Sequence, residues 1–257
     1  MRNLWRLALL VLLSAAALQL YFAARVALMA VVDPQSTTFQ RSEAWRLLTE
    51  STAPSWSQKW MAYERISPQL KRAVIASEDA GFTEHSGVEW DALEKAWERN
   101  QKAEARVEKT NGRLDARPGN PGLARAGVAK LRPQAKLVGG STITQQLAKN
   151  LFLGSERSLL RKGQEFVITF MLEGLLGKQR ILEIYLNSVE WGEGVFGAEA
   201  AARHYFHVPA QALGSSQAAQ LAVMLPAPKR FEKRPGSAYV VGRAATVAAR
   251  MGAVELP

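Results

Sequence analysis

The chain begins with an apolar run that is long enough to cross a lipid bilayer. Residues 7–32 contain few polar side chains, Ser14 and Gln19 being the only ones before Arg25. A helix of about 20 apolar residues spans the roughly 30 Å of hydrocarbon in a bilayer. The run therefore predicts a transmembrane helix, and any globular body must fold from the residues that follow it.

Two other interpretations of this run stay open. A cleaved signal peptide has an apolar core of only about 7–15 residues, although Ala15 and Ala17 would suit a signal peptidase. The other alternative is a core helix of a globular domain. Such a helix usually has a polar face, which this segment lacks. Arg2 and Arg6 precede the run, and the positive-inside bias keeps such a short basic terminus in the cytoplasm. We therefore expect the chain after Asp33 to lie outside.

Composition excludes several classes of site. There is no cysteine, so disulfides, thiolate zinc sites, iron–sulfur clusters and cysteine nucleophiles are ruled out. With only three histidines we predict no histidine-rich metal site. The 33 Lys and Arg against 23 Asp and Glu give a net charge of +10, which favours phosphates, nucleic acid or anionic membrane as partners.

The remaining chain is predicted to be mainly helical, because no period-2 strand pattern of useful length and no internal repeat is found. Ser67 and Pro68 predict a helix start, and Leu70, Val74 and Glu78 then fall on one face. Further helices are predicted over 91–101, 142–152, 158–177, 179–187, 197–205 and 214–225.

Two stretches carry weaker signals. Residues 33–66 are polar and mixed, with scattered tryptophans, and predict either a stalk or an amphipathic collar at the membrane interface. Residues from about 102 to 137 are basic and contain the breaker run Pro118–Gly122, which predicts a long loop or mobile insertion.

Glu78 is the first candidate for chemistry. It extends the apolar stripe of its helix, where desolvation raises the pKa of a carboxyl toward that of a usable general acid or base. The alternative is that Glu78 and Asp79 are ordinary helix-end residues, satisfied by capping or by a nearby arginine.

The segment 139–150 is the second candidate. Two glycines lead into a helix start, where free backbone N–H groups and the shared face of Thr142, Gln146 and Lys149 would suit a pyrophosphate. Thr142 and Gln145 fit a simple capping box equally well.

Two later segments complete the set. Arg161 and Glu165 stand four residues apart, and form either a surface ion pair or a phosphate-binding arginine that Glu165 orients. The glycine-dense stretch 190–197 indicates a tight turn and close helix packing.

In their order and spacing these segments resemble the peptidoglycan glycosyltransferases, which polymerise lipid-linked disaccharide in bacterial cell walls. The resemblance covers roughly Leu70 to Phe231 and rests on EDAGFTEHSG at 78–87, GGSTITQQLAKN at 139–150, RKGQE at 161–165, ILEIYLN at 181–187, EWGEGVFGAEAAARHYF at 190–206 and LPAPKRF at 225–231. It is closest to the monofunctional, membrane-anchored type, because no S-x-x-K or K-T-G element of a transpeptidase follows.

The resemblance implies a mainly α, lysozyme-like glycosyltransferase domain with a small membrane-proximal subdomain, preceded by one transmembrane helix. We expect a cytoplasmic terminus at 1–6, the span at 7–32, the stalk or collar at 33–66, the glycosyltransferase domain at 67–232 and a C-terminal segment at 233–257. The protein would be a single-pass protein of the bacterial inner membrane, with its catalytic domain in the periplasm.

The resemblance also assigns roles. Glu78 becomes the general base that activates the acceptor sugar 4-hydroxyl, and Glu165 becomes the second acidic residue, which assists departure of the lipid pyrophosphate directly or through a divalent cation such as Mg²⁺ or Mn²⁺. The substrate-binding residues would be Asp79, Phe82, His85, Thr142, Gln145, Gln146, Lys149, Asn150, Arg161 and Lys162. No protein-bound metal site is predicted beyond that cation.

The implied partners are lipid II, the growing glycan chain, anionic membrane lipids and proteins of cell division or elongation, with no nucleic acid. The basic insertion would be a flap that touches lipid headgroups or glycan, or a surface insertion without a role. Two other functions remain to be tested: a lysozyme-like peptidoglycan hydrolase, which would not need cations aimed at a pyrophosphate, and a non-catalytic wall-binding scaffold.

Overall fold

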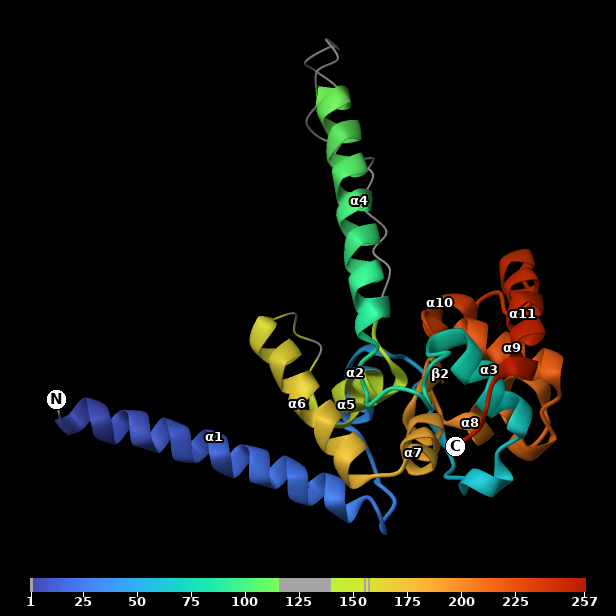
Figure 1. Cartoon of the computed structure of the whole chain (residues 1–257). Coiled ribbons are helices and arrows are strands. Elements are labelled where there is room, and N and C mark those ends of the chain that lie inside the picture. The colour runs from blue at the N-terminus through green and yellow to red at the C-terminus, as the bar shows by residue number, and fades with distance from the viewer. Residues whose placement is uncertain (1, 116–139, 155, 157) are drawn as a thin grey trace. The chain divides into compact units, whose positions relative to one another are not determined.

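The computed structural model describes residues 2–115, 140–154, 156 and 158–257 (Figure 1). The chain divides into two compact units, one made of Met1–Val88 and Thr142–Pro257 and the other of Glu89–Ser141. The candidate site lies within the first unit.

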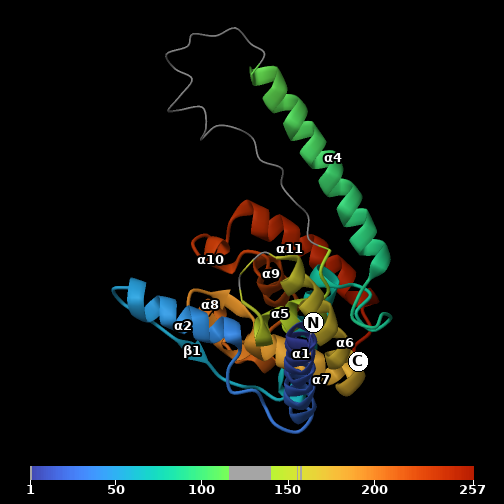
Figure 2. The same ribbon diagram turned by 90° about the vertical axis from the view of Figure 1, so that its left-hand side faces the viewer.

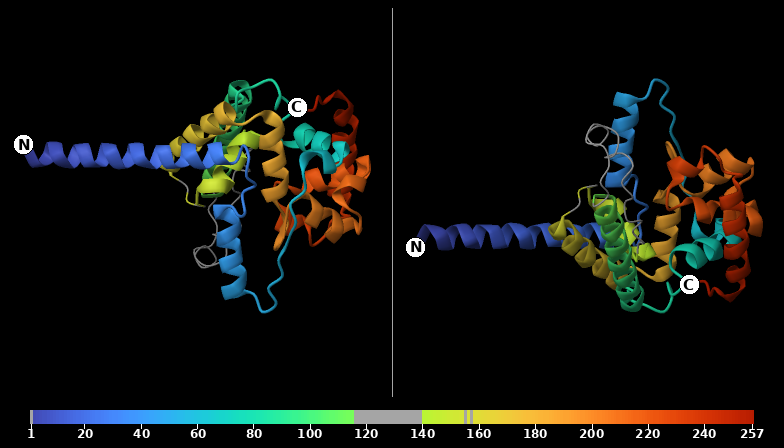
Figure 3. Two further views of the ribbon diagram at one scale, coloured as in Figure 1. Left: turned by 90° about the horizontal axis from the view of Figure 1, so that it is seen from below. Right: turned by 90° about the horizontal axis from the view of Figure 1, so that it is seen from above.

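Helix α1 (Arg2–Leu28) contains the apolar run. It is long and apolar enough to cross a membrane, and no other helix in the described ranges is. Its N-terminal part projects from the other helices of its unit (Figure 3), whereas its C-terminal part packs on α6 (Leu159–Leu175) through buried Phe22 and Val26. The helix itself is confirmed, and the exposed leucines of its projecting part are compatible with a single-pass membrane anchor.

Helices α3 (Pro68–Glu78), α9 (Ser215–Met224) and α11 (Ala238–Arg250) pack against one another (Figure 2) and form one part of the hydrophobic core of the first unit. Ser67 caps α3 by accepting a hydrogen bond from Gln69 N at 3.2 Å, and Pro68 occupies its first turn, as predicted. Residues 233–257, which were expected to lie outside the domain, contain α11. The apolar side of α11 is buried against α3 and α9, and it covers the apolar surface of those two helices in turn.

Residues 33–66, for which a stalk or a membrane collar is predicted, pack against other helices of the first unit. Helix α2 (Thr38–Glu50) packs on α5 (Ile143–Phe152), and the Thr38 hydroxyl donates to Leu151 O at 2.9 Å. Beyond it, the indole of Trp56 stacks on the ring of Phe196 with centroids 4.5 Å apart. These long-range contacts fold the segment into the domain, and residues 33–66 show no pattern that predicts them.

A small sheet, which the sequence did not predict, has the strand order β1-β3-β2. β1 (Ser57–Gln58) pairs in parallel with β3 (Val195–Phe196), and β2 (Glu190–Gly192) pairs antiparallel with β3. Strands of two or three residues are too short to show an alternating pattern.

The other predicted helices of this unit are confirmed to within a few residues at each end: α5, α6, α7 (Lys178–Ser188), α8 (Ala198–Phe206) and α9. Short elements lie between them and at the C-terminus, namely η1 (Tyr63–Arg65), η3 (Ala210–Ala212), α10 (Pro228–Phe231) and η4 (Met251–Ala253).

The glycine-dense turn before α8 is as tight as predicted. Gly194 has φ +70°, and a Cβ there would lie 2.0 Å from Ser55 O. Gly197 has φ +82°, and its Cβ would lie 2.8 Å from Asn187 O. Only glycine combines this backbone conformation with such close approach, so the turn brings β2 and β3 directly onto the end of α7.

The second unit contains α4 (Trp90–Asp115), which is longer than the helix predicted over 91–101. The expectation of a loop from residue 102 is wrong as far as Asp115, because this stretch is rich in Ala, Glu, Lys and Arg, all good helix formers, and has no proline. The rest of the predicted insertion, residues 116–137, lies outside the described residues.

Candidate functional site

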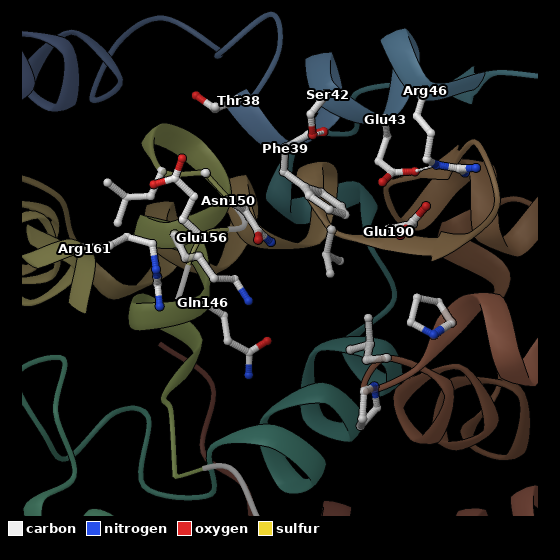
Figure 4. A pocket seen from close by; sticks show the side chains of 17 residues that line it. Thr38, Phe39, Ser42, Glu43, Arg46, Gln146, Asn150, Glu156, Arg161 and Glu190 are labelled. Atoms are coloured by element: carbon white, nitrogen blue, oxygen red, sulfur yellow. Dashed lines mark hydrogen bonds and ion pairs between the residues drawn. The ribbon is translucent and has the colours of Figure 1, made fainter. Parts of the chain in front are cut away.

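A cleft of about 810 Å³ runs across the first unit, with walls from α2, α5 and the residues around β2 and α10 (Figure 4). Gln146 and Arg161 lie at one side of it, and Glu43, Arg46 and Glu190 at the opposite side. The first side carries the cations Lys149 and Arg161, whereas the opposite side carries two carboxylates and one arginine.

Glu78, at the last turn of α3, is tied to the cleft through Gln146. Gln146 Nε2 donates to Glu78 Oε2 at 3.0 Å, and Gln146 Oε1 accepts from the Tyr185 hydroxyl at 2.9 Å. Because the tyrosine can only donate to the amide oxygen in this arrangement, it fixes the amide with its N–H groups toward the carboxylate. Tyr185, fully buried on α7, is thus a positioning residue that the sequence argument missed.

Burial raises the pKa of the Glu78 carboxyl, with a smaller contribution from the Asp79 charge, while hydrogen bonds from Gln146 and Ser77 partly oppose the shift. Burial raises the pKa of Tyr185 as well, and the charges of Glu78 and Asp79 add to it, so the phenol stays a donor. A carboxylate with a raised pKa is suited to take up a proton.

The N-terminus of α5 is closed by the chain itself. Ile143 N donates to Asp79 Oδ2 at 2.9 Å, Thr142 N donates to Gln145 Oε1 at 3.1 Å, and Gln145 N donates to Thr142 Oγ1 at 3.2 Å. The predicted pyrophosphate cradle is therefore wrong for these backbone groups, and the capping box is present. Asp79, Thr142 and Gln145 are almost completely buried and hold α5 in place.

His85 and Phe82 also belong to the framework rather than to the cleft surface. Gly87 N donates to His85 Nδ1 at 3.0 Å, so the ring proton is on Nε2, which lies 2.7 Å from Asp79 Oδ1. Phe82 is completely buried, with the Lys178 ammonium 4.6 Å from its ring centroid. Phe82, predicted to bind substrate, packs its ring into the core and does not line the cleft.

Arg161, Lys162 and Glu165 form a compact ion cluster on the first turns of α6. Arg161 Nη1 donates to Glu165 Oε2 at 2.8 Å, and Lys162 Nζ donates to Glu165 Oε1. Glu165 is buried and Arg161 lines the cleft. The ion pair is therefore not an isolated surface pair, and Glu165 orients the guanidinium at the cleft wall.

Lys149 and Asn150 line the same side of the cleft from the end of α5. Desolvation lowers the pKa of Lys149; the charge of Glu165 opposes this, and those of Arg161 and Lys162 add to it. Within the described part of the chain, Lys149 makes no hydrogen bond or ion pair of 4 Å or less, so its charge is available to an anion in the cleft.

Helix α5 joins the two groups. Gln146 and Lys149 are three residues apart, about 4.5 Å along the helix axis. The hydrogen bond between Gln146 and Glu78 therefore lies about one turn from the cation cluster, which consists of Lys149, Arg161 and Lys162. The cleft is lined by Gln146 and Arg161, with Glu78 and Glu165 directly behind them rather than in its wall. The cleft wall thus carries cations, and a carboxylate bonded to the cleft residue Gln146 lies about one turn of α5 away from them, which is the combination that a displacement reaction with an anionic leaving group requires.

The opposite side of the cleft, where Glu43, Glu190 and Lys229 meet, is not predicted from the sequence. Lys229 Nζ contacts Glu43 Oε2 and lies 3.4 Å from Glu190 Oε1. Glu190 and Lys229 belong to the motifs at 190–206 and 225–231, but the sequence gives no sign that α2 brings Glu43 to them.

Comparison with known proteins agrees with this geometry. The family described as Transglycosylase matches residues 46–110 and 120–252. The chain belongs to the transglycosylase family. The matched ranges include Glu78, all of α5 and the ion cluster on α6, whereas most of the α2 wall of the cleft, residues 38–43, precedes them.

Curated relatives extend the match to almost the whole chain. A protein named biosynthetic peptidoglycan transglycosylase from Burkholderia orbicola is 50% identical over 241 residues, which cover 94% of this chain and 86% of the relative. Proteins of the same name from Burkholderia thailandensis and Burkholderia pseudomallei are 50% and 49% identical, each over 94% of this chain and 82% of the relative. The transglycosylase is therefore an enzyme that transfers glycosyl groups.

Proposed function

We propose that this transglycosylase polymerises a lipid-linked disaccharide-peptide, lipid II, into β-1,4-linked peptidoglycan strands and releases undecaprenyl pyrophosphate. The observation that carries the proposal is that α5 connects, across about one turn, a desolvated carboxylate bonded to Gln146 with the cations Lys149 and Arg161 of the cleft wall. The names of the Burkholderia relatives support peptidoglycan as the product.

In the proposed reaction Glu78 acts as the general base. It takes the proton of the acceptor sugar 4-hydroxyl as that oxygen forms a bond to the donor anomeric carbon, and the bond from that carbon to the diphosphate oxygen breaks with its electron pair. Attack opposite the leaving group inverts the anomeric centre without a covalent enzyme intermediate. Gln146 positions the carboxylate during this step.

The leaving diphosphate gains charge as its bond to the sugar breaks. Lys149 and Arg161 would bind it, because stabilisation of developing charge by preorganised cations is a large part of catalysis in a cleft. Glu165 acts through these groups: by bonding Arg161 and Lys162 it holds the guanidinium in one orientation, so we propose it as a positioning residue.

The described residues around Glu165 do not suit the divalent cation that the resemblance suggested. Both carboxylate oxygens already contact cationic side chains, and among the described residues no second carboxylate is paired with Arg161 or Lys162. A metal ion prefers several oxygen ligands, so it would have to displace these cations. We therefore assign no step to a metal ion.

We place the reaction at the outer surface of the inner membrane. Gln19 of α1 and Gln164 of α6 exchange amide hydrogen bonds of 2.8 and 2.9 Å, so α6 lies beside the membrane span. The first residues of α6, Leu159 and Leu160, are about nine-tenths exposed. Apolar side chains beside a span are suited to lipid, which would place the cation cluster near the headgroups, with the basic net charge adding attraction to anionic lipid.

A label on α6 tests this placement. The chain has no cysteine, so Leu160→Cys carries a single nitroxide probe. In proteoliposomes we expect that probe to collide more often with lipid-soluble oxygen than with a water-soluble nickel chelate. Ala245→Cys, at an exposed position of α11, is the matched control and is expected to give the reverse order. Equal accessibility of the two sites to the nickel chelate would contradict the placement.

The function itself is tested with purified full-length protein and fluorescent lipid II. New long glycan on a gel supports the polymerase. Shortening of added glycan would support the hydrolase, and neither product would support the scaffold. A penicillin-sensitive transpeptidase activity is not part of the proposal, so penicillin should leave the product unchanged.

Tyr185→Phe is expected to lower kcat by roughly tenfold, with KM close to that of the wild type, because the loss of one buried hydrogen bond costs about 1–2 kcal/mol. Without the phenol the Gln146 amide is free to turn away from Glu78, and the pKa of Glu78 should rise further because a hydrogen bond that lowers it is lost. The acid limb of kcat should therefore move to higher pH. A purely structural role would lower the melting temperature without moving that limb.

A further inference from the structure

The end of the cleft opposite the cation cluster holds a carboxyl group that the proposed reaction does not use. Glu190 of β2 lines the cleft, although only 6% of its surface is exposed (Figure 4). Its Oε1 atom is buried and, among the residues that the structure describes, has only the Lys229 ammonium at 3.4 Å near it, with no hydrogen bond of good geometry. A buried carboxylate oxygen without a hydrogen bond is costly, so a ligand hydroxyl would satisfy it.

The charges around Glu190 leave it only partly neutralised. The ammonium of Lys229 lies 3.4 Å from Glu190 Oε1 but also contacts the carboxylate of Glu43, so one cation serves two anions. Five other titratable or charged groups face this end of the cleft. Glu43 and Arg46 come from α2, Tyr205 from α8, Lys229 from α10, and Glu232 directly follows α10.

These surroundings raise the pKa of the Glu190 carboxyl. Burial raises the pKa of its carboxyl to about 7, against the opposing charge of Lys229, and the carboxylates of Glu43 and Glu232 add to the rise. The same carboxylates repel a diphosphate from this end of the cleft. A neutral ligand with hydroxyl donors is not repelled.

The wall between the two ends suits a sugar. The ring of Phe39 lies between Arg161 on one side and Glu190 on the other (Figure 4). Ligand sites commonly combine an apolar or aromatic wall with a few placed polar groups, and the carbon face of a pyranose can pack on such a ring while its hydroxyls reach polar side chains.

We propose that Glu190 forms a sugar-binding subsite, in which its carboxylate accepts a hydrogen bond from a ring hydroxyl of the glycan and Lys229 holds the carboxylate in place. The subsite rests on the proposed function and extends it, since it assigns the end of the cleft away from the diphosphate to the uncharged part of the substrate. Glu190 would set affinity for sugar rather than the rate of bond formation.

Steady-state kinetics of the full-length protein with fluorescent lipid II at pH 6, 7 and 8 test the subsite. Glu190→Ala is expected to raise KM about tenfold at pH 8, with kcat within about twofold of the wild type, because a hydrogen bond to a charged acceptor is lost. In the wild type KM should fall as the pH rises from 6 to 8 and the carboxyl ionises. Glu190→Gln, which keeps an acceptor but cannot ionise, should show a KM that changes little over this range.

Glu193→Gln is the matched control. Glu193 stands three residues further along, is half exposed and pairs with Arg46 without lining the cleft, so its KM and pH dependence should equal those of the wild type. Circular dichroism melts of all variants check folding, and Glu190→Gln is expected to fold because an uncharged isostere is easier to bury.

A KM for Glu190→Ala within twofold of the wild type at pH 8, or wild-type pH dependence in Glu190→Gln, would overturn the subsite. These outcomes are distinct from failure of the proposed function, in which the wild type itself would form no glycan from lipid II.

Discussion

Glu78→Gln is expected to reduce the rate of glycan polymerisation by about 10²–10⁴-fold, the usual contribution of a general base. Glutamine has the shape of glutamate and can still accept the hydrogen bond from Gln146, so the arrangement of α3 and α5 should persist. The loss should appear in kcat, measured with fluorescent lipid II in single-turnover and steady-state assays. Circular dichroism should show an unchanged helical fold.

The pH dependence of the wild type gives an independent check of the same assignment. A general base works only when it is ionised, and burial raises the pKa of Glu78 above its ordinary value of 4.5. The acid limb of the rate profile should therefore lie above that value. Glu84→Gln, on the exposed turn after α3, is the control and should retain the wild-type rate and profile. A Glu78→Gln enzyme with more than a tenth of the wild-type rate would exclude Glu78 as the base.

Lys149→Met is expected to reduce kcat by about 10²–10³-fold, the effect of removing one preorganised group that stabilises developing negative charge. Lys149 is the strongest test of the cation cluster, because its charge is not taken up by an ion pair of 4 Å or less within the described residues, whereas Arg161 and Lys162 are paired with Glu165. Methionine keeps the length and apolar stem of lysine, so the variant removes little but the charge.

Two matched variants sharpen that experiment. Lys149→Arg keeps the positive charge and should recover much of the lost rate, which a packing role would not explain. Lys59→Met removes an exposed lysine outside the cleft and should leave kcat unchanged. Equal activity of Lys149→Met and Lys59→Met would show that the diphosphate is bound elsewhere.

The local pattern of the sequence was sufficient for the helices and for most of the cleft. Capping residues, apolar spacing and glycines are local signals, so α3 and α5 to α9 of the first unit could be predicted to within a few residues. Their motifs also contain Glu78, Lys149 and Arg161, because each motif is one short stretch of chain. What these signals lack is information about which buried partner a polar side chain will meet.

Tertiary structure decided the division between framework and cleft. Asp79, Thr142 and Gln145 have polar groups that could bind a ligand, but these groups are already hydrogen-bonded where α3 meets α5. The bond from Ile143 N to Asp79, for example, joins residues 64 positions apart in the sequence. Conversely, Tyr185 and Glu190 read as ordinary members of a helix and a turn until Gln146 and Lys229 are placed beside them.

The sequence by itself determined that this chain has an apolar N-terminal helix and a helical domain with a carboxylate and cations in ordered motifs, because hydrophobic period and capping depend on neighbours along the chain. Only the tertiary structure decided that residues 33–66 and 233–257 belong to that domain, and which polar groups remain open to a substrate. The physical reason is that burial and hydrogen-bond partnership arise between residues far apart in sequence, where no local pattern records them.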